Sequence, residues 1–289
     1  MENTVRYDYY VEKVGTGSPL IFLPGGGFSG NAGFIIADRL KQDFETHMID
    51  LPGLGRSIGI NQKIDTRVLA DWMREYLDQQ QIERAHLVGH SLGGAILLAF
   101  AVHYPERVNQ LVLLDQGHKS CPKVPVSEFG AFGYAFPLLD AGVKLFGRPV
   151  LRKLASLFKT EDKEVTDVHV QKFCDHVGVE PDEYVALSLG TPAEFSANGV
   201  RVLFGYYHMN LPELMKKLRV PALLAYATFR HHDEKEWDQT FRAIDHLKRF
   251  NLPVSYRAVE GGHHVHWTDP TLLEDIEAFL TKRTEAVHR

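Results

Sequence analysis

Short apolar runs alternate with amphipathic stretches along most of this chain. Runs typical of buried or half-buried strands cover residues 7–13, 19–23, 44–49, 85–88, 108–114, 222–227 and 254–259. Apolar side chains recur at helical spacing in residues 34–40, 65–77, 95–104, 237–250 and 269–280. Strands that alternate with helices favour a mostly parallel central sheet with helices on both faces, so the pattern predicts an α/β fold.

The alternation is interrupted between residues 116 and 215. This segment is rich in Phe, Leu, Gly and Pro, and several of its stretches look helical. We therefore predict a core domain made of residues 1–115 and 216–289, with a mainly helical cap or lid inserted at residues 116–215. The aromatic side chains of the insertion either line a pocket for an apolar acyl or aryl group or only pack the cap onto the core: Phe129, Phe132, Tyr134, Phe136, Phe195, Phe204, Tyr206 and Tyr207.

One stretch of the insertion, residues 144–154, is both basic and amphipathic. Such a stretch can lie on a membrane surface, or it can be a cap helix whose charged face meets solvent. We expect the second arrangement and therefore no membrane contact.

Charge and cysteine content narrow the choice of partners. The net charge of −5 and the isoelectric point of about 6.3 argue against a general nucleic-acid binder. The two cysteines, Cys121 and Cys174, are too few for a disulfide framework and match no metal-binding spacing, so we expect reduced thiols in a cytoplasmic protein. The first residues lack a signal-peptide pattern, and no apolar run reaches 18 residues. Nothing in the sequence indicates an oligomeric state.

The most informative motif is Gly89-His90-Ser91-Leu92-Gly93, which follows a predicted strand and precedes a predicted helix. The G-x-S-x-G pattern in this context is typical of a sharp turn that exposes a nucleophilic serine. Glycine is needed on both sides because strand and helix crowd together there. We therefore expect Ser91 to be a nucleophile.

A serine hydroxyl needs an imidazole to accept its proton. The loop Gly261-Gly262-His263-His264-Val265-His266 follows the last predicted strand and precedes the last helix. We expect His263 to be the base, with His266 as the alternative. The histidines lack carboxylate or cysteine partners at a metal-binding spacing, so no metal is expected.

The imidazole in turn needs a carboxylate that holds its tautomer. Two aspartates lie between serine and histidine and follow predicted strands. Asp115 directly ends the strand after the serine strand, and Asp233 lies farther out, in the loop after residues 222–227. The residues alone do not decide which of the two aspartates is the acid.

The negative charge that develops on a substrate carbonyl needs backbone N–H donors. One is expected from Leu92, and another from Gly26 or Gly27 in Pro24-Gly25-Gly26-Gly27. This glycine run lacks the G-x-G-x-x-G spacing of a dinucleotide loop, so no cofactor is expected.

Four motifs in this order resemble the α/β-hydrolase superfamily: the glycine run at 25–27, residues 50–57 (DLPGLGRS), the Ser91 turn and the Gly262-His263 loop. The resemblance covers the chain except the 116–215 insertion, which corresponds to the variable cap. Pro24 replaces the usual histidine, and Arg230 stands roughly where the usual aspartate is expected. The second departure favours Asp115 over Asp233 as the acid, since some members place their acid after the earlier strand.

A serine nucleophile excludes the branches of this superfamily that use aspartate, such as dehalogenases and epoxide hydrolases. The resemblance implies a serine hydrolase of the carboxylesterase kind, cleaving small carboxylic esters through an acyl-enzyme. Lactones, thioesters and activated C–C bonds are related targets. The alternatives are a receptor-like homologue that binds a ligand with little turnover, or a cofactor-free oxygenase or peroxidase.

Overall fold

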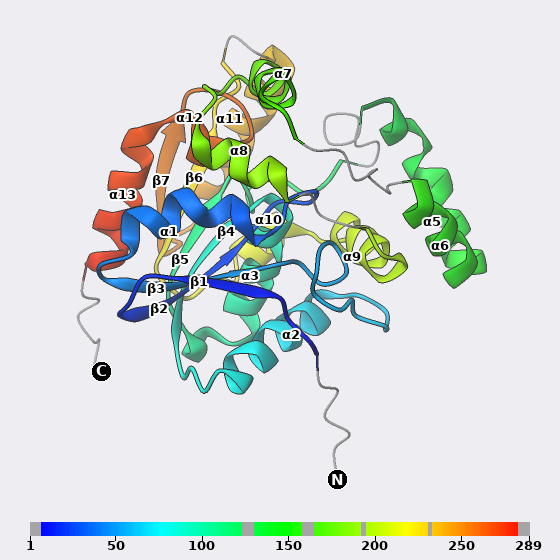
Figure 1. Cartoon of the computed structure of the whole chain (residues 1–289), viewed down its shortest axis with the longest axis horizontal. Coiled ribbons are helices and arrows are strands. Elements are labelled where there is room, and N and C mark those ends of the chain that lie inside the picture. The colour runs from blue at the N-terminus through cyan, green and yellow to red at the C-terminus, as the bar shows by residue number, and fades with distance from the viewer. Residues whose placement is uncertain (1–6, 123–129, 158–164, 192–194, 231–232, 283–289) are drawn as a thin grey trace.

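In the computed structural model, one seven-stranded sheet runs through the molecule in the order β1-β3-β2-β4-β5-β6-β7 (Figure 1). The structure describes residues 7–122, 130–157, 165–191, 195–230 and 233–282. The strands are β1 (Val11–Val14), β2 (Ser18–Leu23), β3 (Phe44–Ile49), β4 (Ala85–His90), β5 (Val108–Leu114), β6 (Ala222–Ala227) and β7 (Val254–Val259). β1 pairs antiparallel with β3, and the other neighbours are parallel. The predicted α/β fold class is confirmed.

Helices cover both faces of the sheet, as its buried strands require. One face carries α2 (Thr66–Gln79), α3 (Ser91–His103), α10 (Leu211–Met215) and α11 (Glu234–Lys248). The other face carries α1 (Phe34–Leu40), α7 (Asp167–Val177), α8 (Glu183–Gly190), α12 (Val265–Thr268) and α13 (Pro270–Thr281). Short 3-10 turns are η1 (Gly30–Gly33), η2 (Pro105–Arg107) and η3 (Gly130–Ala135).

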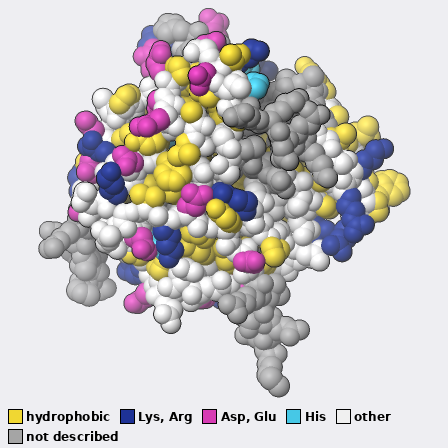
Figure 2. All heavy atoms as spheres, viewed as in Figure 1, with side chains coloured by type: hydrophobic (Ala, Val, Ile, Leu, Met, Phe, Trp, Pro, Cys, Tyr) yellow, Lys and Arg dark blue, Asp and Glu magenta, His cyan; other side chains and the backbone are white. Residues whose placement is uncertain are grey.

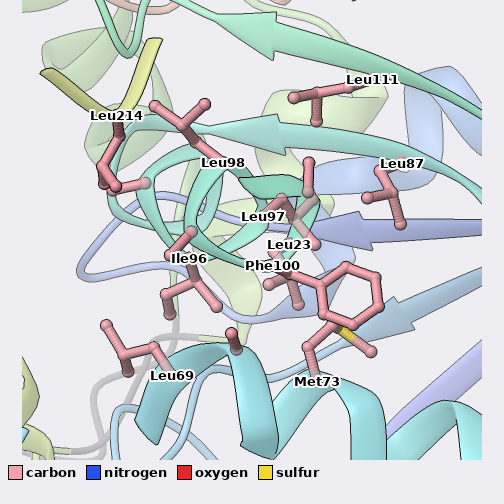
Figure 3. Packing of buried hydrophobic residues seen from close by; sticks show 14 of the residues in the cluster. Leu23, Leu69, Met73, Leu87, Ile96, Leu97, Leu98, Phe100, Leu111 and Leu214 are labelled. Carbon is pink, nitrogen blue, oxygen red and sulfur yellow. The ribbon is translucent and has the colours of Figure 1, made fainter. Parts of the chain in front are cut away.

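Helix α3 is enclosed on all sides, which fixes the position of its first residue. Every residue from Ser91 to Ala101 is buried. Figure 3 shows Leu97 and Phe100 of α3 between side chains of the sheet, such as Leu23 and Leu87, and Met73 of α2. A helix held in this way cannot shift without opening cavities, and a lost large side chain costs about 2–5 kcal/mol.

The 116–215 insertion does not pack as one separate body. Helices α5 (Phe136–Phe146), α6 (Arg148–Leu157) and α9 (Ala197–Tyr207) share a small apolar cluster of Phe136, Leu151, Leu154, Ala155, Val200 and Phe204. By contrast, buried residues of α7 and α8 join the core on the α1 side of the sheet, and those of α10 join the opposite side. Among the described helices of the insertion, α5 and α6 lie at the edge of the molecule, away from the sheet (Figure 1).

Several predicted element boundaries were wrong, and three of them have a local reason. Residues 7–10 are not part of a strand, because the Tyr10 N–H donates to Ser57 Oγ at 2.9 Å and the Asp8 carbonyl accepts from the Ile58 N–H at 3.0 Å. The basic stretch 144–154 is not one helix, since Gly147 has φ 63° and separates α5 from α6. Helix α11 begins at Glu234, earlier than predicted, because the Asp233 side chain caps it.

Candidate active site

Ser91 lies at the turn between β4 and α3, in a backbone conformation that nearby glycines permit. Its φ is +49°, in the left-handed region that non-glycine residues rarely adopt. A Cβ on Gly89 would lie 2.6 Å from the Gly94 Cα, and a Cβ on Gly93 would lie 2.4 Å from the Leu23 carbonyl oxygen. The two glycines of the motif are therefore required by close backbone contact. The turn places Ser91 at the carboxyl end of a central strand.

Asp115 follows β5 and lies beside the serine turn. The parallel register pairs His90 with Leu114, so Ser91 and Asp115 directly follow two paired residues. The Asp115 carboxylate is buried, and its Oδ1 accepts a hydrogen bond from the Ala227 N–H at 2.9 Å. Its Oδ2 accepts from His263 Nδ1 at 2.6 Å, across 148 positions of sequence. The structure therefore brings Asp115 and His263 together.

The tautomer of His263 follows from this contact. A carboxylate can only accept, so Nδ1 carries the proton and Nε2 is left as the basic nitrogen of the neutral ring. Burial by itself would raise the pKa of Asp115, but the hydrogen bond and positive charge of His263 hold that pKa below its usual value. The carboxylate is thus kept charged in a buried position.

The alternative residues occupy other positions. Asp233 is exposed and caps α11, where its Oδ1 accepts from the N–H groups of Lys235 and Glu236. His266 is buried in α12, and neither of its ring nitrogens has a hydrogen-bond partner within the described part of the chain. Burial lowers the pKa of His266 to about 3. Neither residue has the geometry that joins Asp115 to His263.

The glycine loop lies against the start of α3. The Gly93 N–H donates to the Pro24 carbonyl at 3.0 Å, which ties the two segments together. A Cβ on Gly26 would lie 3.7 Å from the Leu92 side chain, so these two residues are neighbours. Gly27 has φ +92°, and the first N–H groups of a helix, such as that of Leu92, have no intrahelical acceptor. Leu92 directly follows Ser91, Gly26 lies beside Leu92, and Gly27 is the next residue of the glycine loop.

His90, which the sequence reasoning did not single out, connects the serine strand to the histidine loop. Its Nε2–H donates to the His263 carbonyl oxygen at 3.0 Å, and the two rings lie 4.7 Å apart. The ring centroids of His90 and His266 lie 4.8 Å apart. Burial and the neighbouring histidines lower the pKa of His90 well below its usual value, so the ring stays neutral. In the sequence, the position of His90 directly before Ser91 was the only feature that pointed to a role for it.

A second imidazole missed by the sequence reasoning is that of His118, which lies near Oδ1 of Asp115, whereas His263 bonds to Oδ2. Its Nε2 lies 3.8 Å from Asp115 Oδ1, and the side chain is buried. Burial lowers the pKa of His118 to about 4. His118 is therefore neutral at pH 7 and does not pair with the Asp115 carboxylate as a cation. His263 remains the hydrogen-bond partner of that carboxylate.

A cavity of about 1160 Å³ opens beside Asp115 and His263. Its wall combines aromatic with polar and charged side chains: Asp115, Gln116, His118, Lys119, Ser120, Cys121, Pro122, Tyr134, Tyr206, Phe229, Asp233, Lys235, Glu236, Gln239, Arg242 and His263. Lys119 forms an ion pair with Glu236, so part of this charge is internally balanced. The cavity is large enough for a small organic substrate and is not purely apolar.

The aromatic residues of the insertion divide between the two roles expected for them. Tyr134 and Tyr206 line the cavity. Phe136 packs against Phe204 and Tyr207, with ring centroids about 5 Å apart. The side chains of Phe129 and Phe132 lie outside the described part of the chain.

No three His, Cys, Asp or Glu side chains in the described ranges converge on a point where an ion could be held. Among the described helices, none combines the length and apolar character needed to cross a membrane.

Comparisons with known proteins agree with this architecture. Residues 18–143 match the family model of the alpha/beta hydrolase fold. The chain is 34% identical to a 2-hydroxy-6-oxononadienedioate/2-hydroxy-6-oxononatrienedioate hydrolase of Burkholderia vietnamiensis, over 92% of this chain and 88% of that one. Among solved structures it is similar to E-2-(acetamidomethylene)succinate hydrolase (17% identity, TM-score 0.67, 96% of each chain). It is also similar to carboxylesterase CesB of Bacillus subtilis (20% identity, TM-score 0.64, 96% of this chain and 90% of that chain).

The family model covers strands β2 to β5 and the serine turn, and the Burkholderia relative aligns with 92% of this chain. The resemblance inferred from the motifs is confirmed: the chain belongs to the α/β-hydrolase superfamily.

Proposed function

We propose that this protein is a serine hydrolase in which Ser91, His263 and Asp115 form the catalytic triad. The observation that carries the proposal is the 2.6 Å hydrogen bond between His263 and the buried Asp115, at the strand end next to Ser91. Carboxylate, imidazole and serine in this relation make up the arrangement that activates a hydroxyl for attack on a carbonyl carbon.

The proposed reaction proceeds in two halves. Ser91 Oγ bonds to the carbonyl carbon of the substrate while its proton passes to His263 Nε2, and Asp115 stabilises the resulting imidazolium. The negative oxygen is held by backbone N–H groups of Leu92 and of Gly26 or Gly27. The bond to the leaving group then breaks, and the leaving group takes the proton from His263. Water, deprotonated by His263, releases the acid and restores Ser91.

Small carboxylic esters are the first substrate class to test, because the leaving alkoxide needs only the proton that His263 holds. The second candidate is a C–C bond next to a carbonyl, and the 34% identity to the Burkholderia dienedioate hydrolase favours it. There the leaving carbon must be stabilised as an enolate, so the substrate needs a further carbonyl in conjugation.

The test is active-site labelling followed by a substrate panel. An alkyl fluorophosphonate should label the wild-type protein at Ser91 and leave Ser91→Ala unlabelled. Ser91→Ala should also lower kcat on any accepted substrate by about 10³-fold or more.

The panel contains p-nitrophenyl esters of increasing chain length, lactones and 2-hydroxy-6-oxo-6-phenylhexa-2,4-dienoate. Turnover of the dienoate with poor ester turnover would move the assignment to C–C hydrolysis. Failure of the fluorophosphonate to label folded wild-type protein would contradict the nucleophile assignment. Specific labelling without turnover of any panel member would favour a receptor-like homologue.

A further inference from the structure

Helices α5 and α6 form a protruding pair, called here the α5–α6 hairpin (residues 136–157), at the side of the molecule away from the sheet (Figure 1). Gly147 makes the turn between the two helices. The inner side chains Phe136, Leu151 and Leu154 are buried against α9. This packing fixes which face of the hairpin points outward.

The outward face of the hairpin carries large apolar side chains. Leu138 and Leu145 are each 77% exposed, and they are seven residues apart and so lie on one stripe of α5. Phe146 is 68% exposed and Leu157 is 65% exposed. Single exposed apolar residues are ordinary, but a group on one protruding element indicates an interaction surface.

Cations lie beside these apolar side chains. The hairpin contains Lys144, Arg148, Arg152 and Lys153 and one acidic residue, Asp140, so its net charge is +3, whereas that of the whole chain is −5. Asp140 is buried and pairs with Lys144 at 2.8 Å. Figure 2 shows yellow and dark blue side chains together at this edge of the molecule.

Two arginines and one lysine of α6, Arg148, Arg152 and Lys153, are exposed. In the parts of the chain that the structure describes, none of the three has a carboxylate within ion-pair distance. Their charge is therefore available to an external partner. Residues 158–164, which follow α6, lie outside the described part.

In place of the solvent-facing cap helix that the sequence alone favoured, we propose that the α5–α6 hairpin docks on the surface of an anionic membrane. Apolar side chains that enter the headgroup boundary, next to cations that meet lipid phosphates, are the combination that binds a helix to such a surface. A second copy of this chain fits less well, because a twofold contact through the same face would bring the same cations together. The proposal is independent of the proposed hydrolase activity.

Docking in this way has a consequence for the cavity. Tyr134 lines the cavity, is 73% exposed, and lies two residues before α5. The hairpin and the cavity wall are thus adjacent in the chain, and docking holds that part of the wall close to the lipid surface.

The experiment is co-sedimentation of the full chain with vesicles. One set consists of phosphatidylcholine alone, and the other of phosphatidylcholine mixed with phosphatidylglycerol. We expect the wild-type protein to bind the anionic vesicles, to bind the neutral vesicles at least tenfold more weakly, and to dissociate at high salt.

Two variants separate the apolar and the electrostatic contributions. The first carries L138Q, L145Q and F146Q, and the second carries R148Q, R152Q and K153Q. Because each cation near an anionic surface contributes about fivefold in affinity, the second variant should bind on the order of a hundredfold more weakly. The matched control is F241Q on α11, whose side chain is 62% exposed and apolar but lies outside the hairpin; it should bind like the wild type.

Circular dichroism first verifies that each variant is folded, and light scattering gives its mass. The proposal is overturned if wild-type protein does not bind anionic vesicles, if both hairpin variants bind like the wild type, or if F241Q loses binding equally. It is also overturned if the wild type is a dimer that the first variant dissociates without any effect on vesicle binding, since that result would assign the apolar face to a second copy.

Discussion

Replacing Asp115 by asparagine keeps the shape of the side chain and removes its negative charge. The two carboxylate oxygens have different partners: Oδ1 accepts from the Ala227 N–H at 2.9 Å, and Oδ2 accepts from His263 Nδ1 at 2.6 Å. An amide has one acceptor and one donor side, so it can satisfy only one of these two donors.

The orientation of the new amide decides the protonation of His263. If its oxygen stays on the Ala227 N–H, its NH₂ faces His263 Nδ1. The ring then carries its proton on Nε2 and cannot accept the proton of Ser91. If the amide turns around, its NH₂ points at the Ala227 N–H, and a buried hydrogen bond is lost.

These alternatives set the expected magnitude. An unsatisfied buried donor costs about 1–3 kcal/mol, so the productive orientation is reduced by about 5- to 150-fold. The imidazolium also loses its counter-charge, and the corresponding change in a well-studied serine protease lowers kcat by about 10⁴. We expect Asp115→Asn to lower kcat by about 10³ to 10⁴, with a much smaller change in KM.

The assay is steady-state turnover of the best substrate in the panel, and the control is Asp233→Asn. Asparagine caps a helix about as well as aspartate, so this variant should keep activity within about threefold. Unfolding in urea verifies that both variants are stable.

The reasoning is refuted if Asp233→Asn is severely impaired while Asp115→Asn is nearly normal. That ranking would make Asp233 the acid. If both variants stay active, His263 works without a carboxylate partner.

Three further predictions follow from the same geometry. His263→Ala should reduce kcat about as much as Ser91→Ala, because triad members act as a unit, whereas His266→Ala should reduce it by less than about tenfold; the reverse ranking in the same turnover assay would make His266 the base. Gly25→Ala would place a Cβ 2.8 Å from His90 Nδ1 and 3.4 Å from Ser91 Cβ. We expect kcat to fall on the order of tenfold or more, while circular dichroism shows an intact fold. Unchanged turnover would show that this contact is unimportant. Because burial lowers the pKa of His266 to about 3, its neutral ring stabilises the fold fully above pH ~6.5 and progressively less as the pH falls toward 3. The free energy of unfolding should lose about 2 kcal/mol from this group between pH ~6.5 and ~5. Urea titrations of His266→Leu should therefore show a flatter pH dependence than those of the wild type.

Much of the architecture was predictable from local patterns. Buried strands and amphipathic helices have different periodicities, so most strands and helices were correctly predicted from the sequence. The Ser91 turn was also predictable, because close backbone contacts at Gly89 and Gly93 exclude a side chain and therefore leave a readable motif. Boundaries failed where a cap or a single glycine, as at Asp233 and Gly147, decided them.

Tertiary contacts decided what local patterns left open. Asp115 and Asp233 both follow strands, and only the packing of the histidine loop over the β5 end joins His263 to one of them. The link from His90 to the His263 backbone spans 173 positions, and nothing in either segment indicates it.

The α5–α6 hairpin shows the same limit in another form. A sequence can show that residues 144–154 have an apolar and a basic face, but it cannot show which side of each helix a neighbour covers. Packing against α9 buries Leu151 and Leu154 and leaves Leu138 and Leu145 in solvent. Periodicity arises from one segment alone, whereas burial and pairing arise from two segments that meet, and so only the folded chain determines them.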